Sequence, residues 1–272
     1  GGVLSFASAP DYETKTSYTA TVTATDGTNS NTQSVTVSVT NLNDNSPVFT
    51  SSATFSADEN QTAIGTVAAS DADGETLSYS ISGTDASSLS INSSTGVLTF
   101  DSAPDYETKS SYTVTATATD GTNSTTQSIT VTVTDVDDVA PVFSSSSSYS
   151  AAENQTAIGT VTATDVDSSS TTFTVSGSEL SITSAGVLTF ASAPDYETKS
   201  SYTATVTATD GTNSTTQSVT VTVTDVDDVA PVFTSSSAFS AAENQTAIGT
   251  VTATDVDSSS TTFTVSGSEL AI

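Results

Sequence analysis

Residues 111–134, SYTVTATATDGTNSTTQSITVTVT, decide the fold class of this chain. Apolar residues alternate with threonine over 112–118 and again over 129–133. A period of two places the apolar groups on one face and the hydroxyl groups on the other, which is typical of antiparallel strands that pack on one side. Asp120-Gly121 lies between the two runs and is a turn signal. The stretch therefore predicts two strands of a half-buried β-sheet.

The same pattern returns along the chain as a long repeat. The motif P-D-Y-E-T-K begins at Pro10, Pro104 and Pro194, which are 94 and then 90 residues apart. Other motifs, such as E-N-Q-T-A-I-G-T-V and A-T-D-G-T-N, recur with the same steps. A unit of about 90 residues has the size of a domain rather than of a solenoid turn.

The repeat frame divides the chain into whole and half repeats. Residues 2–6 match 96–100 in the middle of one repeat, and residues 268–272 match 178–182 in the middle of another. The predicted domains are a C-terminal half repeat (1–46), two whole repeats (47–140 and 141–230) and an N-terminal half repeat (231–272). Two interpretations follow. We favour the interpretation that the chain is a window on a longer tandem array. The alternative is a discrete subunit in which residues 231–272 of one chain are completed by residues 1–46 of the next.

The predicted fold class is all-β. No stretch shows helical spacing over three turns, and Thr, Val, Tyr and Phe suit a pleated, half-buried surface. About seven short strands in each unit of about 90 residues, each with one apolar face, predict a two-layer Greek-key sandwich.

Composition excludes several classes of function. The chain carries 31 acidic residues against three basic ones, a formal charge of −28, so nucleic acid and anionic membrane surfaces are not expected partners. Cys and His are absent, which excludes disulfides and any zinc site built on them. No apolar run approaches the ~20 residues of a membrane span, so we expect no membrane insertion within this segment.

The acidic residues recur in pairs two positions apart, such as Asp165/Asp167 and Asp195/Glu197. In an extended segment both carboxylates of such a pair point the same way and repel each other unless a cation lies between them. Calcium takes six to eight hard oxygen ligands in irregular geometry, and a chain with no imidazole or thiol suits Ca²⁺ better than a transition metal. Paired carboxylates also serve glycosidases, but here they recur in every repeat, and no nucleophile–base pair is available. We expect no enzyme.

The order of these motifs resembles the cadherin repeat. Along each unit the sequence reads E-N-x-x-x-x-x-G-T-V, D-x-D, D-Y-E, A-x-D-G and then D-V-D-D-V-A-P-V-F. The cadherin elements in this order are a basal glutamate, D-x-D, D-R-E, the aspartate of A-x-D and the linker D-x-N-D-N-x-P. Residues 41–47, N-L-N-D-N-S-P, are the closest copy of that linker. The resemblance covers the whole chain.

The resemblance implies about three Ca²⁺ ions at each junction between successive repeats, bound by oxygens of both repeats and of the linker. At the first junction, near residue 46, the implied ligands are Asp11, Glu13, Asn43, Asp44, the carbonyl groups of Leu42 and Asn45, Asp71, Asp73 and Asp120. At the second, near 140, they are Glu59, Asp105, Glu107, Asp137, Asp138, the carbonyl groups of Val136 and Val139, Asp165, Asp167 and Asp210. At the third, near 230, they are Glu153, Asp195, Glu197, Asp227, Asp228, the carbonyl groups of Val226 and Val229, Asp255 and Asp257. Glu243 would serve the next junction along.

These features predict a structural role outside the cell. Calcium at the junctions would stiffen the repeats into a rod, and we expect a calcium-binding segment of a large bacterial surface fibre or adhesin, secreted or surface-anchored, that serves cell-surface, matrix or cell–cell adhesion. The expected partners are adjacent repeats of the same or neighbouring chains. Alternative interpretations are a recognition module for a glycan or a homophilic partner, and a self-polymerising subunit whose half repeats are completed by neighbouring chains.

Overall fold

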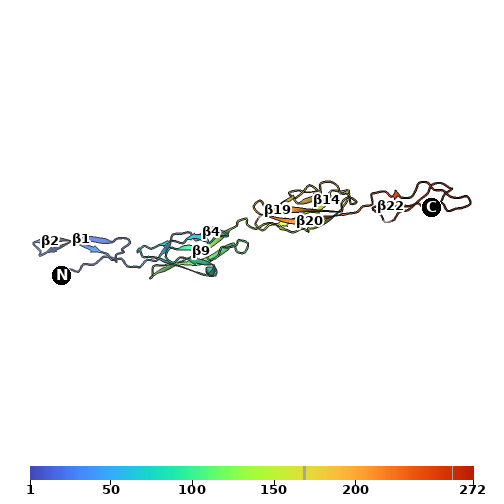
Figure 1. The fold of residues 1–272 in the computed structure, drawn as a ribbon. Helices are drawn as coiled ribbons and strands as arrows, with labels where there is room; N and C mark the ends of the chain where they lie inside the picture. The colour runs from blue at the N-terminus through green and yellow to red at the C-terminus, as the bar shows by residue number, and fades with distance from the viewer. Residues whose placement is uncertain (168–169, 259) are drawn as a thin grey trace. The chain divides into compact units, whose positions relative to one another are not determined.

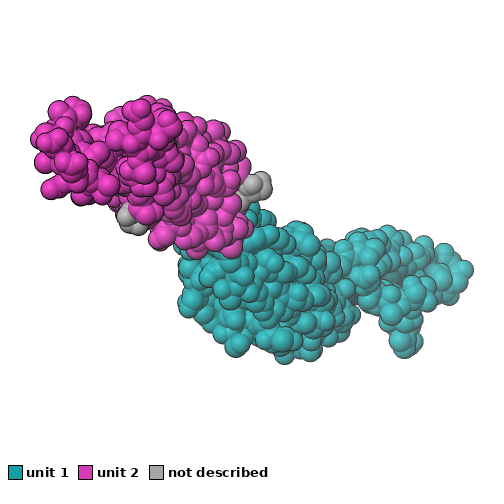
Figure 2. Space-filling view, turned by 90° about the vertical axis from the view of Figure 1, so that its right-hand side faces the viewer, with its two compact units in different colours: residues 1–136 teal, residues 137–272 magenta. Residues whose placement is uncertain are grey.

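A computed structural model describes residues 1–167, 170–258 and 260–272. The chain divides into two compact units, residues 1–136 and 137–272 (Figure 2). The boundary falls inside the predicted linker between the two whole repeats. Each unit is described by itself.

The first unit begins with a hairpin that is formed by the C-terminal half repeat (Figure 1). Strand β1 (Ser17–Thr25) pairs antiparallel with β2 (Ser30–Ser38), with Tyr18 opposite Val37. The turn between them is closed by Asp26, whose Oδ1 accepts hydrogen bonds from the backbone N–H groups of Thr28 and Asn29 at 2.9 and 2.7 Å. The A-T-D-G-T-N motif is thus a hairpin turn, as its sequence predicts.

A sandwich of two main sheets follows in the first unit. The larger sheet has the order β4-β11-β10-β7, and its strands are β4 (Thr54–Asp58), β7 (Ser78–Ser82), β10 (Ser111–Thr119) and β11 (Ser124–Thr134). The smaller sheet has the order β5-β9-β8, formed by β5 (Ala63–Thr66), β8 (Leu89–Ile91) and β9 (Val97–Phe100). The short strands β3 (Val48–Phe49) and β6 (Ala69–Ser70) pair beside them, and a 3₁₀ turn, η1 (Ala86–Ser88), precedes β8.

Apolar side chains of both sheets meet in one core. Leu98 of the smaller sheet and Ile129 and Val131 of the larger sheet are fully buried in it. Along β10 the buried residues alternate with threonines, so the period of two in residues 111–134 reports the inner and outer faces correctly. The all-β sandwich predicted from the sequence is confirmed.

One strand pairing differs from the antiparallel pattern that we expected. β4 runs parallel to β11, with Phe55 opposite Val131. The two strands lie near opposite ends of the repeat, and the other strands of the two main sheets come between them in sequence. A long connection of this kind allows a parallel pair, which a short hairpin turn cannot form.

The second unit contains a sandwich with the same topology (Figure 1). Its larger sheet has the order β13-β20-β19-β16, formed by β13 (Ser148–Ala152), β16 (Thr172–Val175), β19 (Ser201–Thr209) and β20 (Ser214–Thr224). Its smaller sheet has the order β14-β18-β17, formed by β14 (Ala157–Thr160), β17 (Leu180–Ile182) and β18 (Val187–Phe190). The pair β12 (Val142–Phe143) and β15 (Ala163–Thr164) completes it.

The N-terminal half repeat at the end of the second unit forms little regular structure. Within the described part of residues 231–272, the strands are β21 (Val232–Phe233) and β22 (Ala253–Thr254), which pair with each other. In the whole repeat, β13 and β16 pair with β20 and β19, which belong to the second half of that repeat. Residues 231–272 have no such partners among the described strands, which explains why the matching segments are not strands.

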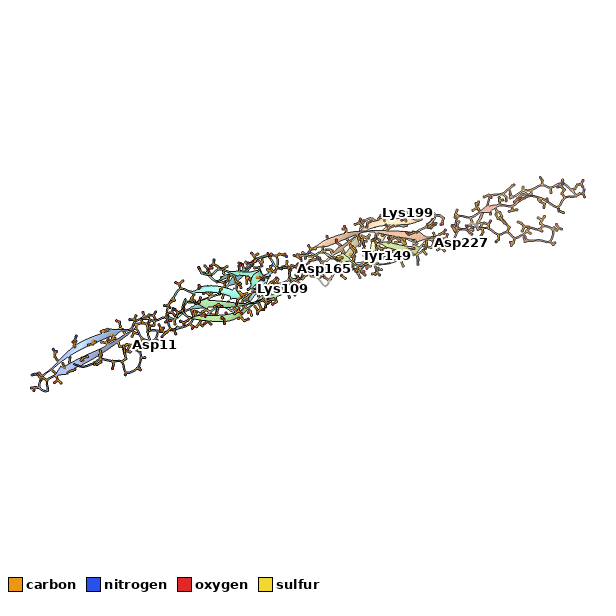
Figure 3. The ribbon with its side chains drawn as sticks, turned by 90° about the horizontal axis from the view of Figure 1, so that it is seen from below. Asp11, Lys109, Tyr149, Asp165, Lys199 and Asp227 are labelled. Carbon is orange, nitrogen blue, oxygen red and sulfur yellow. The ribbon has the colours of Figure 1, made fainter. Side chains whose placement is uncertain are left out.

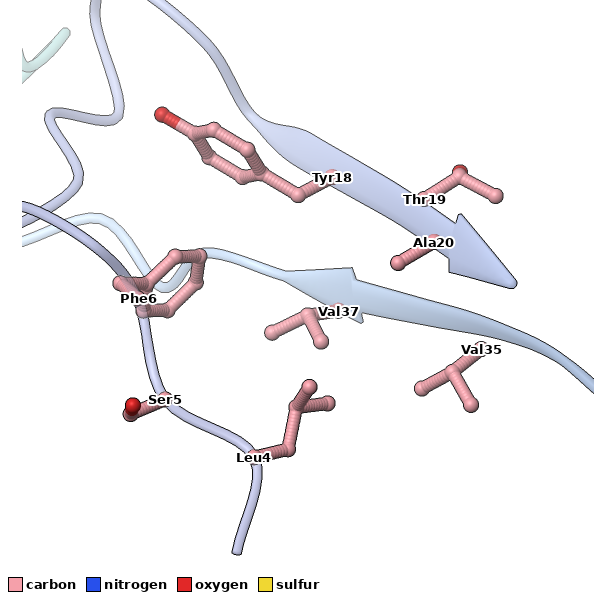
Figure 4. A pocket seen from close by; sticks show the side chains of 8 residues that line it. All are labelled: Leu4, Ser5, Phe6, Tyr18, Thr19, Ala20, Val35 and Val37. Carbon is pink, nitrogen blue, oxygen red and sulfur yellow. The ribbon is translucent and has the colours of Figure 1, made fainter. Parts of the chain in front are cut away.

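The half repeat at residues 1–46 leaves the inner face of its hairpin partly uncovered, with residues 4–6 beside it. Leu4 and Phe6 are 58% and 41% exposed, whereas Leu188 and Phe190, at the matching positions of the second unit, are 0% and 2% exposed. The face forms an apolar hollow (Figure 4) lined by Leu4, Ser5, Phe6, Tyr18, Thr19, Ala20, Val35 and Val37. The apolar members of this set are side chains of the kind that a whole repeat packs in its core.

Each of the three lysines follows D-Y-E and lies over a tyrosine ring. The Nζ atoms of Lys15, Lys109 and Lys199 are each 4.4 Å from the ring centroid of the tyrosine three residues later. Lys109 also forms an ion pair with Asp85, and Lys199 forms one with Glu179. Among the described residues we find no helix with the length and apolar character of a membrane span.

Candidate metal centres

The first junction lies wholly within the first unit, and four segments build it. They are the D-Y-E turn before β1, the linker after β2, the D-x-D turn after β6 and the hairpin turn after β10. Carboxylate oxygens of Glu13, Asp44 and Asp73 lie within 4.8 Å of one another. The structure thus brings together one predicted ligand from each of three segments that are far apart in sequence.

The D-Y-E turn is shaped by its own aspartate. Asp11 accepts hydrogen bonds from the backbone N–H and the hydroxyl group of Thr14, at 3.2 and 2.9 Å, and these bonds lower the pKa of Asp11. Figure 3 shows Asp11 in the loop that leads into β1. Asp105 and Asp195 close the same turn with Thr108 and Thr198. The turn presents the glutamate two positions later to the junction.

The second aspartate of D-x-D holds the linker at all three junctions. Oδ2 of Asp73 accepts hydrogen bonds from the backbone N–H groups of Asp44 and Asn45, at 3.0 and 2.8 Å. Asp167 binds the N–H groups of residues 138 and 139 in this way, at 3.0 and 2.6 Å, and Asp257 binds those of residues 228 and 229, at 2.8 and 2.6 Å. Oδ1 of Asp73 also accepts a bond from the side-chain amide of Asn45 at 2.9 Å, but the bonds shared by all three junctions use only the backbone of the linker.

Several carboxylate oxygens at the junctions are buried without a hydrogen-bond donor among the described residues. They include Oδ2 of Asp71, Oδ1 of Asp167, Oδ2 of Asp210 and Oδ1 of Asp257, and also Oε2 of Glu75, which clusters with Asp71 and Asp73. A buried, unpaired carboxylate oxygen is costly unless a cation or a donor contacts it. The four aspartates are residues that the cadherin resemblance implies as calcium ligands, whereas Glu75 is not in that set. This is the observation by which the residues present fit a hard cation.

The basal glutamates Glu59 and Glu153 are buried charged residues, 4% and 3% exposed. One oxygen of Glu59 accepts a bond from the Val136 N–H at 2.9 Å and the other from the Tyr106 N–H at 2.8 Å. Glu153 binds the N–H groups of residues 226 and 196 in the same way, both at 2.8 Å. Each glutamate therefore joins the linker to the D-Y-E turn of its own repeat.

Further carboxylates gather around each basal glutamate. Glu59 lies with Glu107 and Asp135, and Glu153 lies with Asp195 and Glu197, in each case with oxygens within 4.8 Å of one another. The two lysines that form ion pairs bind Asp85 and Glu179 instead, outside these groups. The clusters therefore collect negative charge that these lysines do not balance.

The third junction lies wholly within the second unit, and two of its carboxyl groups have raised pKa values. Oxygens of Glu197, Asp225 and Asp257 lie within 4.8 Å of one another. Desolvation raises the pKa of Glu197, and the charges of Glu153, Asp257 and Asp225 add to the rise. Desolvation also raises the pKa of Asp225, helped by the charge of Asp257. Asp227 lies in this linker (Figure 3).

The first junction shows the same effect at Glu13. A hydrogen bond from its own backbone N–H lowers the pKa of Glu13, but desolvation and the neighbouring Asp73 outweigh it, so the pKa is raised. At both junctions that lie within one unit, the charge of a neighbouring carboxylate therefore helps to raise the pKa of a glutamate.

The implied ligands of the second junction belong to both units. Within the first unit some of them lie in a cluster, and within the second unit hydrogen bonds hold them. In the first unit, Glu59, Glu107 and Asp135 form the cluster described above. In the second unit, Asp167 holds the linker residues 138 and 139, and Oδ1 of Asp165 accepts a bond from the N–H of Asp167 at 3.0 Å. Figure 3 shows Asp165 at the linker end of this unit.

Glu243 and Asp255 lie in the half repeat 231–272. Asp255 accepts bonds from the N–H groups of Asp257 and Ser258 at 3.0 and 3.1 Å, which is the D-x-D turn of the other repeats. Glu243 is exposed, unlike Glu59 and Glu153. Its burial in a whole repeat depends on a D-Y-E turn and a linker, and residues 231–272 contain neither after Glu243.

The structure adds residues that the sequence-based ligand set omits. Asp135 and Asp225, at the first position of the linker, each belong to a carboxylate cluster. Asn41 is their counterpart at the first junction, where its amide nitrogen binds the carbonyl oxygen of Asp73 at 2.8 Å and its own Oδ1 is buried without a donor among the described residues. The signal was present, because Asp225 and Asp227 form an i, i+2 acidic pair. Glu75, which clusters with Asp71 and Asp73, has no acidic counterpart in the later repeats of the sequence.

Comparison with known proteins shows what these repeats are similar to. The cadherin domain model matches residues 52–134. Protocadherin Fat 4 of Mus musculus is 39% identical over 171 residues, which is 58% of this chain and 3% of that protein. Protocadherin Fat 1 of Homo sapiens is 42% identical over 151 residues, which is 49% of this chain and 3% of that protein. The chain therefore spans only a small part of these relatives.

Solved structures show the same likeness over more of the chain. Mouse cadherin-23 EC22-24 has a TM-score of 0.61 and 27% identity, covering 80% of this chain and 78% of that one. The protocadherin GammaB4 extracellular domain has a TM-score of 0.68 and 28% identity, covering 84% of this chain and 40% of that one. Together with the repeated sandwiches and motifs, these matches show that the chain is built from cadherin-like repeat domains.

Proposed function

We propose that this chain is a calcium-rigidified structural segment of a large extracellular fibre or adhesin. The observation that carries the proposal is the set of buried carboxylate oxygens without donors, within the described residues, at the D-x-D and A-x-D-G aspartates. At the first and third junctions, carboxylates from the D-Y-E turn, the linker and the following repeat come together in a cluster. An arrangement of oxygen ligands alone suits Ca²⁺.

At the third junction, each of the chain's own residues has a distinct role. The basal glutamate and the second aspartate of D-x-D hold the linker backbone from its two sides. Desolvation, together with the charges of neighbouring carboxylates, raises the pKa of Glu197 and of Asp225. Bound Ca²⁺ would supply the positive charge that offsets this repulsion. Ordering of the linker and cation binding are then coupled, because both depend on the same oxygens.

An extracellular location and a role in adhesion are supported by the cadherin-like repeats, since similar repeats occur in the protocadherin GammaB4 extracellular domain. The proposed partners are adjacent repeats of the same or neighbouring chains. The net charge of −28 disfavours nucleic acid as a partner. A bacterial source and the absence of catalysis stay predictions, and the relatives reported above come from mouse and human.

Calcium titration of the 272-residue chain tests the proposal. Isothermal calorimetry should show binding heat. Saturation at about 100 times Kd should raise the melting temperature of a repeat by about 10–20 °C over the chelated protein. Small-angle X-ray scattering should show a narrower distribution of dimensions with calcium than with chelator. Equal melting curves in both conditions, with no heat of binding, would contradict the assignment.

Assembly through the half repeats is a second candidate function. The partly uncovered face of residues 1–46 carries the same residue types that residues 141–182 cover in the second unit, and residues 231–272 repeat that covering segment. A segment of this kind from another copy can complete the sandwich. Light scattering should then show multimers that Val22→Asp abolishes. A monomer at high concentration would contradict this function and leave the calcium proposal untouched.

A further inference from the structure

Asn123 lies at the end of the hairpin turn between β10 and β11. Oδ1 of Asp120 accepts hydrogen bonds from the backbone N–H groups of Thr122 and Asn123, at 2.6 and 2.7 Å. The N–H of Asp120 in turn donates to the carbonyl oxygen of Asn123 at 3.3 Å. The turn is therefore closed by backbone groups and Asp120, which leaves the amide group of Asn123 available for other contacts.

That amide group reaches the linker. Its Nδ2 donates to Oδ1 of Asn43 at 2.8 Å, to the carbonyl oxygen of Asn45 at 2.9 Å and to Oδ2 of Asp120 at 3.3 Å. An amide nitrogen carries two hydrogens and no negative charge, so it presents the positive end of a dipole to these oxygens. All three acceptor residues belong to the ligand set implied for the first junction.

A matching contact is present in the second unit, where both acceptor oxygens belong to one linker residue. Nδ2 of Asn213 donates to the carbonyl oxygen and to Oδ1 of Asp137, both at 3.1 Å. Asp210 closes the turn as Asp120 does, with bonds of 2.6 and 2.7 Å. Asp137 stands at the position of Asn43, so a side-chain Oδ1 accepts the bond at this position in both units, although the residue type changes. Two copies of the contact indicate that it is a regular feature of the repeat.

We propose that the amides of Asn123 and Asn213 are linker clamps, which hold oxygens of the linker against the hairpin turn in the cation-free protein. The clamp rests on the proposed function, because it orders the oxygens that a cation would use. Ordering a flexible segment in advance lowers the entropy cost of binding. The residues are positioning residues: they act on the metal centre through the linker.

Hydrogen exchange of the chelated 272-residue chain tests the clamp. Asn123→Ala should speed exchange of the backbone amides of Asp44 and Asn45, while amides of β10 and β11 keep their rates. Asn123→Asp, which keeps the size of the side chain and replaces the donor by an acceptor, should speed the same linker amides at least as much. Saturating calcium should reduce these differences. Calcium affinity at this junction should fall by about tenfold in Asn123→Ala.

The control is Asn29→Ala. Asn29 ends the same turn between β1 and β2, and its side chain contacts Asp26 of that turn. This variant should leave exchange of residues 41–46 unchanged. Unchanged linker exchange in chelated Asn123→Ala, or a higher calcium affinity of that variant, would overturn the clamp. Failure of the proposed function is separate, because it would appear as absence of calcium binding by the unsubstituted chain.

Discussion

At the residue scale, the basal glutamates show how a buried charge is kept. Both oxygens of Glu153 accept backbone N–H bonds, one from the linker and one from the D-Y-E turn. A carboxylate is acceptor-only, so it matches two donors that face it. The sequence predicted Glu153 as a ligand by resemblance. It could not predict these hydrogen bonds, because their donors, Tyr196 and Val226, lie 43 and 73 positions away.

Glu153→Gln should destabilise the chelated protein by about 1–3 kcal/mol, because the amide NH₂ would face one of two N–H donors and leave it unsatisfied. Denaturant unfolding in chelator measures this loss. Glu179→Gln is the matched control, since Glu179 is exposed and pairs with Lys199. Equal stability of the two variants would contradict the role assigned to Glu153.

Calcium binding at the third junction should weaken as the pH falls through the raised pKa values of Glu197 and Asp225. Protonation removes the negative charge that attracts the cation. For the cation-free protein the sign is opposite: both pKa values are raised by folding, so the ionised groups oppose folding and acidification through this range relieves the repulsion. Calorimetry at several pH values checks the first effect, and chelated melting curves check the second.

At the element scale, steric crowding explains why a glycine precedes β18. Gly186 has φ +84°, and a Cβ there would lie 2.1 Å from the carbonyl oxygen of Val161. Gly177 also has positive φ, +83°, but a Cβ there would meet no atom within 4 Å. The turn could be predicted from S-A-G, but the close approach of the segment that follows β14 could not.

Gly186→Ala should therefore cost several kcal/mol, whereas Gly177→Ala should cost about 1 kcal/mol for the left-handed backbone alone. Thermal unfolding of both variants measures the difference. Similar costs at the two positions would show that the contact with Val161 does not constrain the turn.

Period-two alternation predicted the long strands of both sandwiches well, because one face of each is buried. It could not predict the parallel pairing of β4 with β11 or the loss of strands in residues 231–272. Both depend on partners that are distant in sequence. The ligand clusters around Asp135 and Asp225 depend on such partners too.

At the scale of the whole molecule, the clustered acidic residues occupy particular positions within each repeat. The clustered acidic residues lie in turns and linkers, while β10 and β11 carry Ser and Thr between their buried residues. Stiffness should therefore respond to changes in the junctions and not to equal changes of net charge elsewhere.

Asp44→Asn should increase flexibility at a fixed calcium concentration, because it removes a carboxylate from the cluster with Glu13 and Asp73. Asp101→Asn changes the net charge equally but affects a residue whose carboxylate binds the Ser90 hydroxyl, away from that cluster. Small-angle scattering compares the two variants. The same profile for both would show that total charge, and not the junction, sets the stiffness.

The backbone contact made by Asp73, Asp167 and Asp257 has a consequence for how such arrays change over generations. Since the aspartate binds main-chain N–H groups, the residues at 45, 139 and 229 can be asparagine or valine without loss of the bond. Recombination that splices any repeat onto any other therefore preserves this anchor. Gene duplication can lengthen the array without redesigning its joints.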